Sequence, residues 1–382
     1  MKADRINLPN KLELEQLAVG YHGKPLIADI AFSLMPGEIV TLIGPNGSGK
    51  TTILKSITRH LPSISGTVYV DGKSSRVLDG RTFATKMAVV LTDRVRPELM
   101  TCRELVAAGR YPYTGSFGRL TMRDREIVDN ALAAVHATDI AQCDISAVSD
   151  GQRQRVMLAR AICQEPEIIV LDEPTSFLDV RHKIELLEIL RTMAKEQGIS
   201  VLMSLHEIDL AQKVSDKIVC VKGERIAAYG TPDEIFTDVQ IASLFEIENG
   251  AYNALLGSIE LKKPQGDVRC FVIGGGGSGI PFYRALQKCG IPFSAGILPE
   301  NDIDYPVASA LAQRVIQTPA YESAGPAQLE EAKRCIDMAD TAIDCGCPIG
   351  THNRANGELL AYARETGKTV VCSLRELSEV VI

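Results

Sequence analysis

Short apolar runs alternate with amphipathic stretches along most of the chain, a pattern typical of strands followed by helices. The run Ile168–Leu171 is continuously apolar, too short for a helix and bounded by Pro166 and Pro174, so it predicts a buried strand. Further strands are predicted at 12–19, 30–34, 38–42, 66–72, 87–92, 200–205 and 218–221, and helices at 151–163, 183–196 and 207–214. This alternation predicts a mainly parallel sheet with helices on both faces.

The pattern loses its periodicity around 249–267, where glycines and a proline accumulate, and then resumes. We therefore predict a first domain at 1–256, a linker at 257–267 and a smaller, Rossmann-like α/β domain at 268–382. In the second domain, strands are predicted at 268–273, 292–298, 341–344 and 369–372, and helices at 281–288, 307–317, 327–339 and 357–366.

A glycine-rich stretch follows the strand at 38–42 and opens into a helix. It reads Gly44-Pro45-Asn46-Gly47-Ser48-Gly49-Lys50-Thr51-Thr52. Glycines allow backbone N–H groups to turn inward, and a helix N-terminus adds the positive end of its dipole. Lys50 is then a point charge for the outer phosphates, and the Thr51 hydroxyl is a ligand for Mg²⁺. A purely structural turn is the alternative, but the strand before and the helix after favour a nucleoside triphosphate site.

Composition narrows the class of protein. The chain has 382 residues, too many for one ordinary core, and its 45% hydrophobic and 23% charged content is that of a globular protein. The net charge of −7 and the lack of a basic stripe disfavour nucleic-acid binding. The N-terminus shows no secretory signal, and the ten cysteines are scattered. These features favour a cytoplasmic protein with reduced thiols.

Two acids, Asp172 and Glu173, end the buried strand at 168–171. A carboxylate there is costly unless a cation or hydrogen bonds compensate it. Together with the phosphate loop, this favours Asp172 as a Mg²⁺ partner and Glu173 as the group that orients the attacking water. The plainer alternative is that both acids cap a solvated turn.

At 11–247 the chain resembles the ATP-binding subunits of ABC transporters, and the motifs occur in the family order. Besides the phosphate loop and the two acids, Val148–Gln152 resembles the signature L-S-G-G-Q, and Ser176–Asp179 resembles the D-loop. His206 stands at the position of the switch histidine, and Tyr21 at that of the aromatic residue that stacks on adenine.

The resemblance implies that two copies pair head to tail with ATP between them. Ser149, Gly151 and Gln152 of one copy would then contact the ATP bound by the phosphate loop of the other. His206 could hydrogen-bond the γ-phosphate, although its position alone would favour a core histidine. The implied catalytic residues are Lys50, Glu173 and His206, and ATP and Mg²⁺ are the implied cofactors.

Two positions depart from the family pattern. Asp150 replaces a signature glycine and adds negative charge near the triphosphate, so its carboxylate must point away, for example by capping the following helix. Thr92, or Asp93 in an alternative alignment, stands where the family usually has glutamine. Thr92 has a shorter reach toward Mg²⁺, so an intervening water is expected. Neither change removes Lys50, Asp172, Glu173 or His206, so ATP turnover is still predicted.

Three classes of ABC protein are open, and the sequence favours the transport ATPase. A single phosphate loop disfavours tandem translation factors, and no long heptad run supports a nucleic-acid-maintenance protein. The segment 104–121 resembles that of the importers of iron chelates, haem and cobalamin. The expected partners are an integral-membrane permease at the inner face of the cell membrane and, indirectly, a substrate-binding protein. A soluble ABC regulator without a permease, or an importer of another substrate, is the alternative.

The second domain carries a second glycine pattern, G-x-G-x-x-G, at Gly274, Gly276 and Gly279, again between a strand and a helix. It predicts a possible dinucleotide or phosphate site, although glycines are also common in tight turns. The alternative is a domain that only dimerises. Cys345 and Cys347 lack partner cysteines for a zinc site, so loop thiols are the better interpretation.

Overall fold

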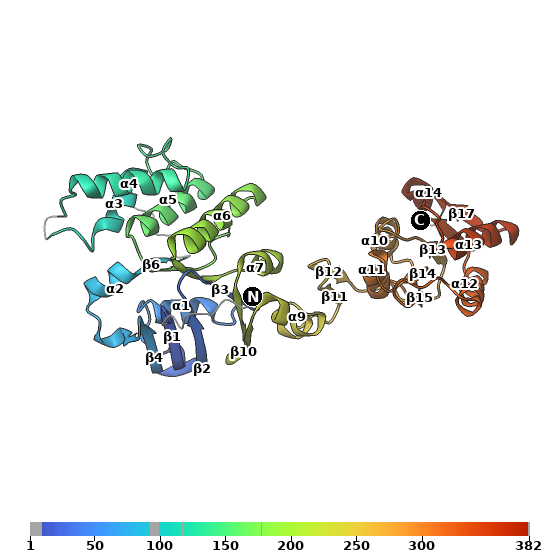
Figure 1. Cartoon of the computed structure of the whole chain (residues 1–382), viewed down its shortest axis with the longest axis horizontal. Helices are drawn as coiled ribbons and strands as arrows, with labels where there is room; N and C mark the ends of the chain where they lie inside the picture. The colour runs from blue at the N-terminus through green and yellow to red at the C-terminus, as the bar shows by residue number, and fades with distance from the viewer. Residues whose placement is uncertain (1–9, 92–98, 116–117, 177, 381–382) are drawn as a thin grey trace, which may run out of the picture. The chain divides into compact units, whose positions relative to one another are not determined.

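The computed structural model describes residues 10–91, 99–115, 118–176 and 178–380. The chain divides into two compact units, Met1–Phe236 and Thr237–Ile382 (Figure 1). The boundary precedes the linker expected at 257–267. That segment contains strand β12, which pairs with β11. It was not predicted because two short strands joined through glycine show no readable periodicity.

The first unit contains two sheets. The antiparallel sheet has the order β2-β1-β4-β5, and the larger sheet has the order β10-β9-β3-β8-β7-β6, with parallel pairing throughout except between β9 and β10. The strands are β1 Leu12–Tyr21, β2 Lys24–Leu34, β3 Ile39–Ile43, β4 Ser65–Val70, β5 Lys73–Ser74, β6 Met87–Val90, β7 Ile168–Leu171, β8 Ser200–Ser204, β9 Lys217–Lys222 and β10 Arg225–Gly230. The α/β fold predicted from the sequence is confirmed, and its larger sheet is mainly parallel as expected.

The helices of the first unit are α1 Lys50–Ile57, α2 Gly80–Lys86, α3 Cys102–Ala107, α4 Met122–Ala134, α5 Asp150–Cys163, α6 Val180–Gln197, α7 Ile208–Val214 and α8 Pro232–Ile235, with 3-10 turns at Ser75–Val77 and Ala108–Arg110. Helices α3, α4 and α5 pack on one another as a helical subdomain (Figure 1). None of the described helices is long and apolar enough to cross a membrane.

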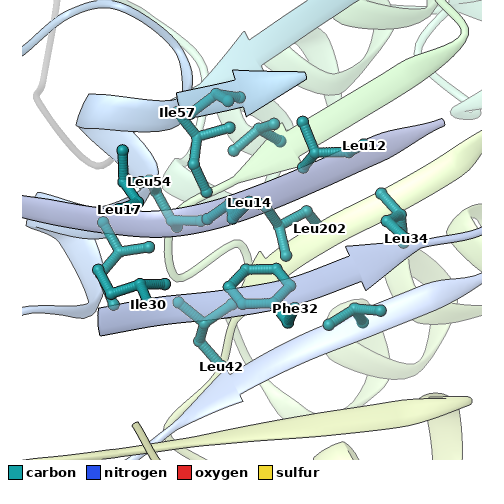
Figure 2. Packing of buried hydrophobic residues seen from close by; sticks show 14 of the residues in the cluster. Leu12, Leu14, Leu17, Ile30, Phe32, Leu34, Leu42, Leu54, Ile57 and Leu202 are labelled. Carbon is teal, nitrogen blue, oxygen red and sulfur yellow. The ribbon is translucent and has the colours of Figure 1, made fainter. Parts of the chain in front are cut away.

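The main core of the first unit lies where its two sheets face each other across helix α1. Leu14 of β1, Phe32 of β2, Leu54 of α1 and Leu202 of β8 meet there, all buried (Figure 2). Alternate residues of β1 and β2 point into this core, so the apolar pattern of these strands is satisfied. Helix α1 and the phosphate loop before it are thereby fixed against both sheets.

The second unit has a five-stranded parallel sheet of order β15-β14-β13-β16-β17. One buried cluster joins the sheet to α10, α11 and α14, and another joins it to α12 and α13, so helices cover both faces. The elements are α9 Asp238–Phe245, β11 Gly250–Asn253, β12 Ser258–Leu261, β13 Cys270–Ile273, α10 Ile280–Lys288, β14 Phe293–Pro299, α11 Asp304–Leu311, β15 Arg314–Thr318, α12 Pro326–Met338, β16 Thr341–Asp344, α13 Arg354–Glu365, β17 Thr369–Val371 and α14 Leu374–Val380. This is the doubly wound arrangement expected of a Rossmann-like domain.

The helix predicted at 307–317 was wrong in its second half. Helix α11 ends at Leu311, and the chain continues as strand β15. Val315 and Ile316 are β-branched, and Ile316 is buried against the sheet. Pairing with β14 therefore outweighs the apolar spacing that favoured one long helix.

Candidate ATP-hydrolysing site

The phosphate loop joins β3 to α1, and its backbone requires glycine. Gly44, Gly47 and Gly49 have φ values of 150°, 77° and 94°. A Cβ on Gly44 would stand 2.1 Å from the carbonyl oxygen of Val221, so no side chain fits there. The loop therefore lies directly against the neighbouring strand β9, with its last glycine at the start of α1.

Lys50 is turned back into the loop. Its Nζ donates to the carbonyl oxygens of Gly44, at 2.8 Å, and Pro45, at 3.0 Å. Burial lowers the pKa of Lys50, while the nearby carboxylates of Glu173 and Asp172 oppose that shift. The described hydrogen bonds of the ammonium group therefore go to carbonyl oxygens of the loop and not to a carboxylate.

Two further features fit the phosphates of a nucleotide. The buried Ser48 hydroxyl has no hydrogen-bond partner among the described residues. Helix α1 begins without a side-chain cap, so its first N–H groups remain for an anion. A cavity of about 350 Å³ opens at this point. Its lining residues are Leu26, Asn46, Gly47, Gly49, Lys50, Thr51, Thr52, Glu173 and His206.

The acids predicted from the sequence lie beside the loop. The Thr51 hydroxyl donates to Asp172 Oδ1 at 3.1 Å, which brings together the two residues expected to hold Mg²⁺. Glu173 Oε1 lies 2.5 Å from His206 Nε2, and its Oε2 accepts from the Ser176 hydroxyl at 3.1 Å. Carboxylate and hydroxyl oxygens are the donors Mg²⁺ prefers, so the residues present fit this ion.

Tyr21 lies at the end of β1, half exposed, with its hydroxyl 3.3 Å from Thr52 Oγ1. Its ring therefore stands at the edge of the phosphate loop, where the resemblance places the adenine-stacking residue. Thr92, the expected additional Mg²⁺ contact, lies outside the described residues.

The signature segment begins helix α5. The Ser149 hydroxyl accepts from Gln152 N at 3.2 Å, and Gln152 Oε1 accepts from Ser149 N at 2.9 Å, so these two residues form a capping box. The sequence suggested that Asp150 could cap this helix, but the N-cap is Ser149. The Asp150 carboxylate accepts from Arg153 Nη1 at 2.6 Å instead, so its charge is paired within the same turn.

Sequence reasoning missed one hydroxyl that contacts both acids and one carboxylate beside the switch histidine. Ser204, at the end of β8, contacts both Asp172 and Glu173. Glu207, next to the switch histidine, accepts from Thr175 Oγ1 at 2.9 Å and from Lys183 Nζ at 2.5 Å. Burial opposes it, but these two hydrogen bonds lower the pKa of Glu207. The only local signal for Ser204 was its position at the end of the apolar run 201–203.

Comparison with known proteins agrees with this geometry. The ABC transporter family model matches residues 27–176. An uncharacterised ABC transporter ATP-binding protein of Methanocaldococcus jannaschii is 42% identical over 72% of this chain and 96% of its own length. The chain belongs to the ABC transporter ATP-binding proteins. Its first unit is an ABC-type ATPase that binds and hydrolyses ATP.

Other ABC relatives extend the comparison. The iron(3+)-hydroxamate import ATP-binding protein of Bacillus subtilis is 38% identical, over 63% of this chain and 89% of its own. The cobalamin import ATP-binding protein of Halobacterium salinarum is 32% identical, over 78% and 76%. A dimeric bacterial ABC transporter cassette superposes with a TM-score of 0.52 at 25% identity, over 58% of this chain and 98% of that one. The model of the MJ0874 family matches residues 293–379 of the second unit.

The second glycine loop of this ABC protein is already occupied by its own carboxylates. Asp302 accepts from Gly276 N at 3.0 Å, and Asp304 accepts from Gly279 N at 2.9 Å and Ile280 N at 3.2 Å. Asp304 is fully buried. Burial and the neighbouring Asp302 raise the pKa of Asp304, against the hydrogen bonds from the loop. A phosphate at this loop would have to displace these carboxylates.

Cys345 and Cys347 follow β16 as free thiols, and burial raises the pKa of both. The described residues contain no group of three or more His, Cys, Asp or Glu that could hold a metal ion. The interpretation of Cys345 and Cys347 as loop thiols stays a prediction.

Proposed function

We propose that this ABC ATPase energises import of an iron chelate, haem or cobalamin through a membrane permease. The observation that carries the proposal is the similarity to importer subunits over nearly the whole length of the iron(3+)-hydroxamate relative, supported by a cavity that Lys50, Glu173 and His206 line. In this role the chain lies at the inner face of the membrane and acts indirectly with a substrate-binding protein.

The geometry supports hydrolysis of ATP by a water molecule that attacks the terminal phosphate. ATP would supply the phosphoryl group, and Mg²⁺, when bound, would neutralise charge on its outer phosphates. Lys50 and the uncapped amides of α1 bind the phosphates, and Thr51 and Asp172 would hold the Mg²⁺. Glu173 orients the attacking water and accepts its proton. His206, already hydrogen-bonded to Glu173, fixes the direction of that carboxylate.

The composite site requires a second copy of the chain. Ser149 caps α5, and Gly151 and Gln152 lie on its first turn, where the N–H groups not bonded to the Ser149 hydroxyl would bind a second anion. We infer a head-to-tail homodimer in which this turn completes the site on the partner's phosphate loop. The similarity to a dimeric ABC cassette supports this arrangement.

The Glu173→Gln variant of the full chain tests the mechanism. It should bind ATP and form a stable ATP-dependent dimer but lose steady hydrolysis, by about 100-fold or more. Turnover equal to that of the wild-type chain would overturn the role of Glu173. Uptake of radiolabelled iron chelate or cobalamin by cells with and without the gene, complemented with the Glu173→Gln variant, tests the transport role. Unchanged uptake of every such cargo would favour a soluble ABC regulator or another substrate.

For the second unit we propose a ligand-sensing or dimerising role toward the ATPase. The unit has its own core and a doubly wound parallel sheet, and such folds bind ligands at the carboxyl ends of their strands. The Asp302 and Asp304 carboxylates disfavour a phosphate at Gly274, Gly276 and Gly279. Calorimetric titration of the full chain with corrinoids, and with nucleotides in a Lys50→Ala variant whose first site is disabled, distinguishes the two roles.

A further inference from the structure

Ser204 ends strand β8 and is fully buried between the two acids of the ATPase site. Its hydroxyl donates to Asp172 Oδ1 at 2.8 Å and accepts from the backbone N–H of Glu173 at 2.9 Å. One hydroxyl therefore bridges the residue that would hold Mg²⁺ and the residue that orients the water.

The contact to Glu173 fixes an unfavourable backbone conformation. Glu173 has a φ of 48°, in the left-handed region that side chains other than glycine rarely adopt. The turn continues with a hydrogen bond from Ser176 N to Glu173 O at 3.1 Å. Without an acceptor for its N–H group, the backbone of Glu173 would relax to an ordinary conformation of lower energy. Its carboxylate would then turn away from the cavity.

The contact to Asp172 fixes the direction of a carboxylate. Asp172 is 2% exposed, and two hydroxyls, those of Thr51 and Ser204, donate to the same oxygen, Oδ1. These hydroxyls come from α1 and from β8, which pairs with β7, and both residues are far from Asp172 in sequence. The Asp172 carboxylate is thus oriented before any cation binds.

We propose that Ser204 is a positioning residue for ATP hydrolysis that aligns Asp172 and Glu173 through its single hydroxyl. Ser204 is not among the residues that line the described nucleotide cavity, so it acts through the two acids. The assignment rests on the ATPase function of the first unit. It adds to that function a link between cation binding and water orientation, because loss of one hydroxyl should affect both.

The test compares Ser204→Ala with Ser204→Thr in the full chain. The alanine removes the hydroxyl, whereas the threonine keeps it. Loss of a hydrogen bond to a charged group predicts a fall in kcat of about 10- to 100-fold for the alanine variant. The Mg²⁺ concentration for half-maximal ATP binding, measured in the Glu173→Gln background where hydrolysis is removed, should rise about tenfold. Threonine should restore both toward wild type.

Ser200→Ala is the matched control. Ser200 lies at the other end of the same strand, is fully buried and donates to the carbonyl oxygen of Met35 at 2.9 Å. Its loss should lower stability but leave the Mg²⁺ dependence of ATP binding unchanged. The proposal is overturned if Ser204→Ala keeps wild-type kcat and Mg²⁺ dependence, or changes them no more than Ser200→Ala. A wild-type chain that fails to bind or hydrolyse ATP would instead overturn the ATPase assignment itself.

Discussion

The Asp150–Arg153 pair predicts how strongly two copies associate around ATP. Asp150 stands in place of a signature glycine, on the turn that would face the partner's triphosphate. In the structure Arg153 Nη1 lies 2.6 Å from its carboxylate. Replacing Arg153 by glutamine leaves the negative charge of Asp150 unpaired, so the ATP-dependent dimer should weaken.

The size of the effect follows from exposure and symmetry. The Asp150 side chain is 54% exposed and that of Arg153 is 23% exposed, so the pair contributes only about 0.5–1 kcal/mol. A two-fold symmetric dimer contains the pair twice, which gives a total of about 1–2 kcal/mol. This corresponds to a dissociation constant about 5- to 30-fold higher. The difference should shrink in about 1 M salt, because exposed charges are then screened.

Sedimentation equilibrium with ATP in the Glu173→Gln background measures the dimer directly. Asp150→Gly should tighten the dimer, and Arg153→Lys, which keeps the charge, should behave nearly as wild type. Arg191→Gln is the matched control, since Arg191 pairs with Glu188 at 3.5 Å on exposed α6, away from the signature turn. The reasoning is refuted if Arg153→Gln matches Arg191→Gln at low salt, or if Asp150→Gly weakens the dimer.

Two further predictions concern stability. Hydrogen bonds from Lys86 and Lys11 lower the pKa of Asp71 against the effect of burial, so its contribution is present at neutral pH and is lost as pH falls through the acidic range. Asp71→Asn should lower the free energy of unfolding by about 1 kcal/mol at neutral pH and by less as the pH falls below about 4, as urea titrations would show; an equal loss at neutral and acidic pH would contradict this. In the second unit, Asp304→Ala removes the acceptor for Gly279 N and Ile280 N and should destabilise that unit by about 2 kcal/mol. Inorganic phosphate should raise the melting temperature of this variant more than that of wild type, and equal stabilisation of both would contradict occupation of the loop by Asp304.

The nucleotide site could largely be predicted because its motifs are local. A glycine loop between a strand and a helix, and acids at a strand end, each express their chemistry within a few neighbouring residues. The structure brings Lys50, Asp172, Glu173 and His206 together as expected. Ser204 was missed because its importance lies in contacts with residues about 30 positions earlier, across the β7–β8 pairing. Such contacts become visible only when the sheet register is known.

The errors in the fold have a similar origin. The linker expected at 257–267 includes strand β12, which has only four residues and so shows no periodicity. Strand β15 was included in a helix because apolar spacing near Leu311 suits both structures. Which one forms depends on whether a neighbouring strand is available for pairing, and β14 is. Local patterns do not contain that information.

The two glycine loops of this chain show why the same pattern leads to different chemistry. Both follow a parallel strand and precede a helix. In both, the residue at the N-cap of that helix is a glycine, which has no side chain to cap it. At the first loop, the buried Ser48 hydroxyl has no described partner and Lys50 supplies positive charge, so an external anion is attracted. At the second loop, Asp304 already binds the first N–H groups of the helix and no lysine takes the place of Lys50. Backbone geometry provides an anion site in either case, and the side chains that reach it decide whether the anion is a nucleotide or the protein's own carboxylate.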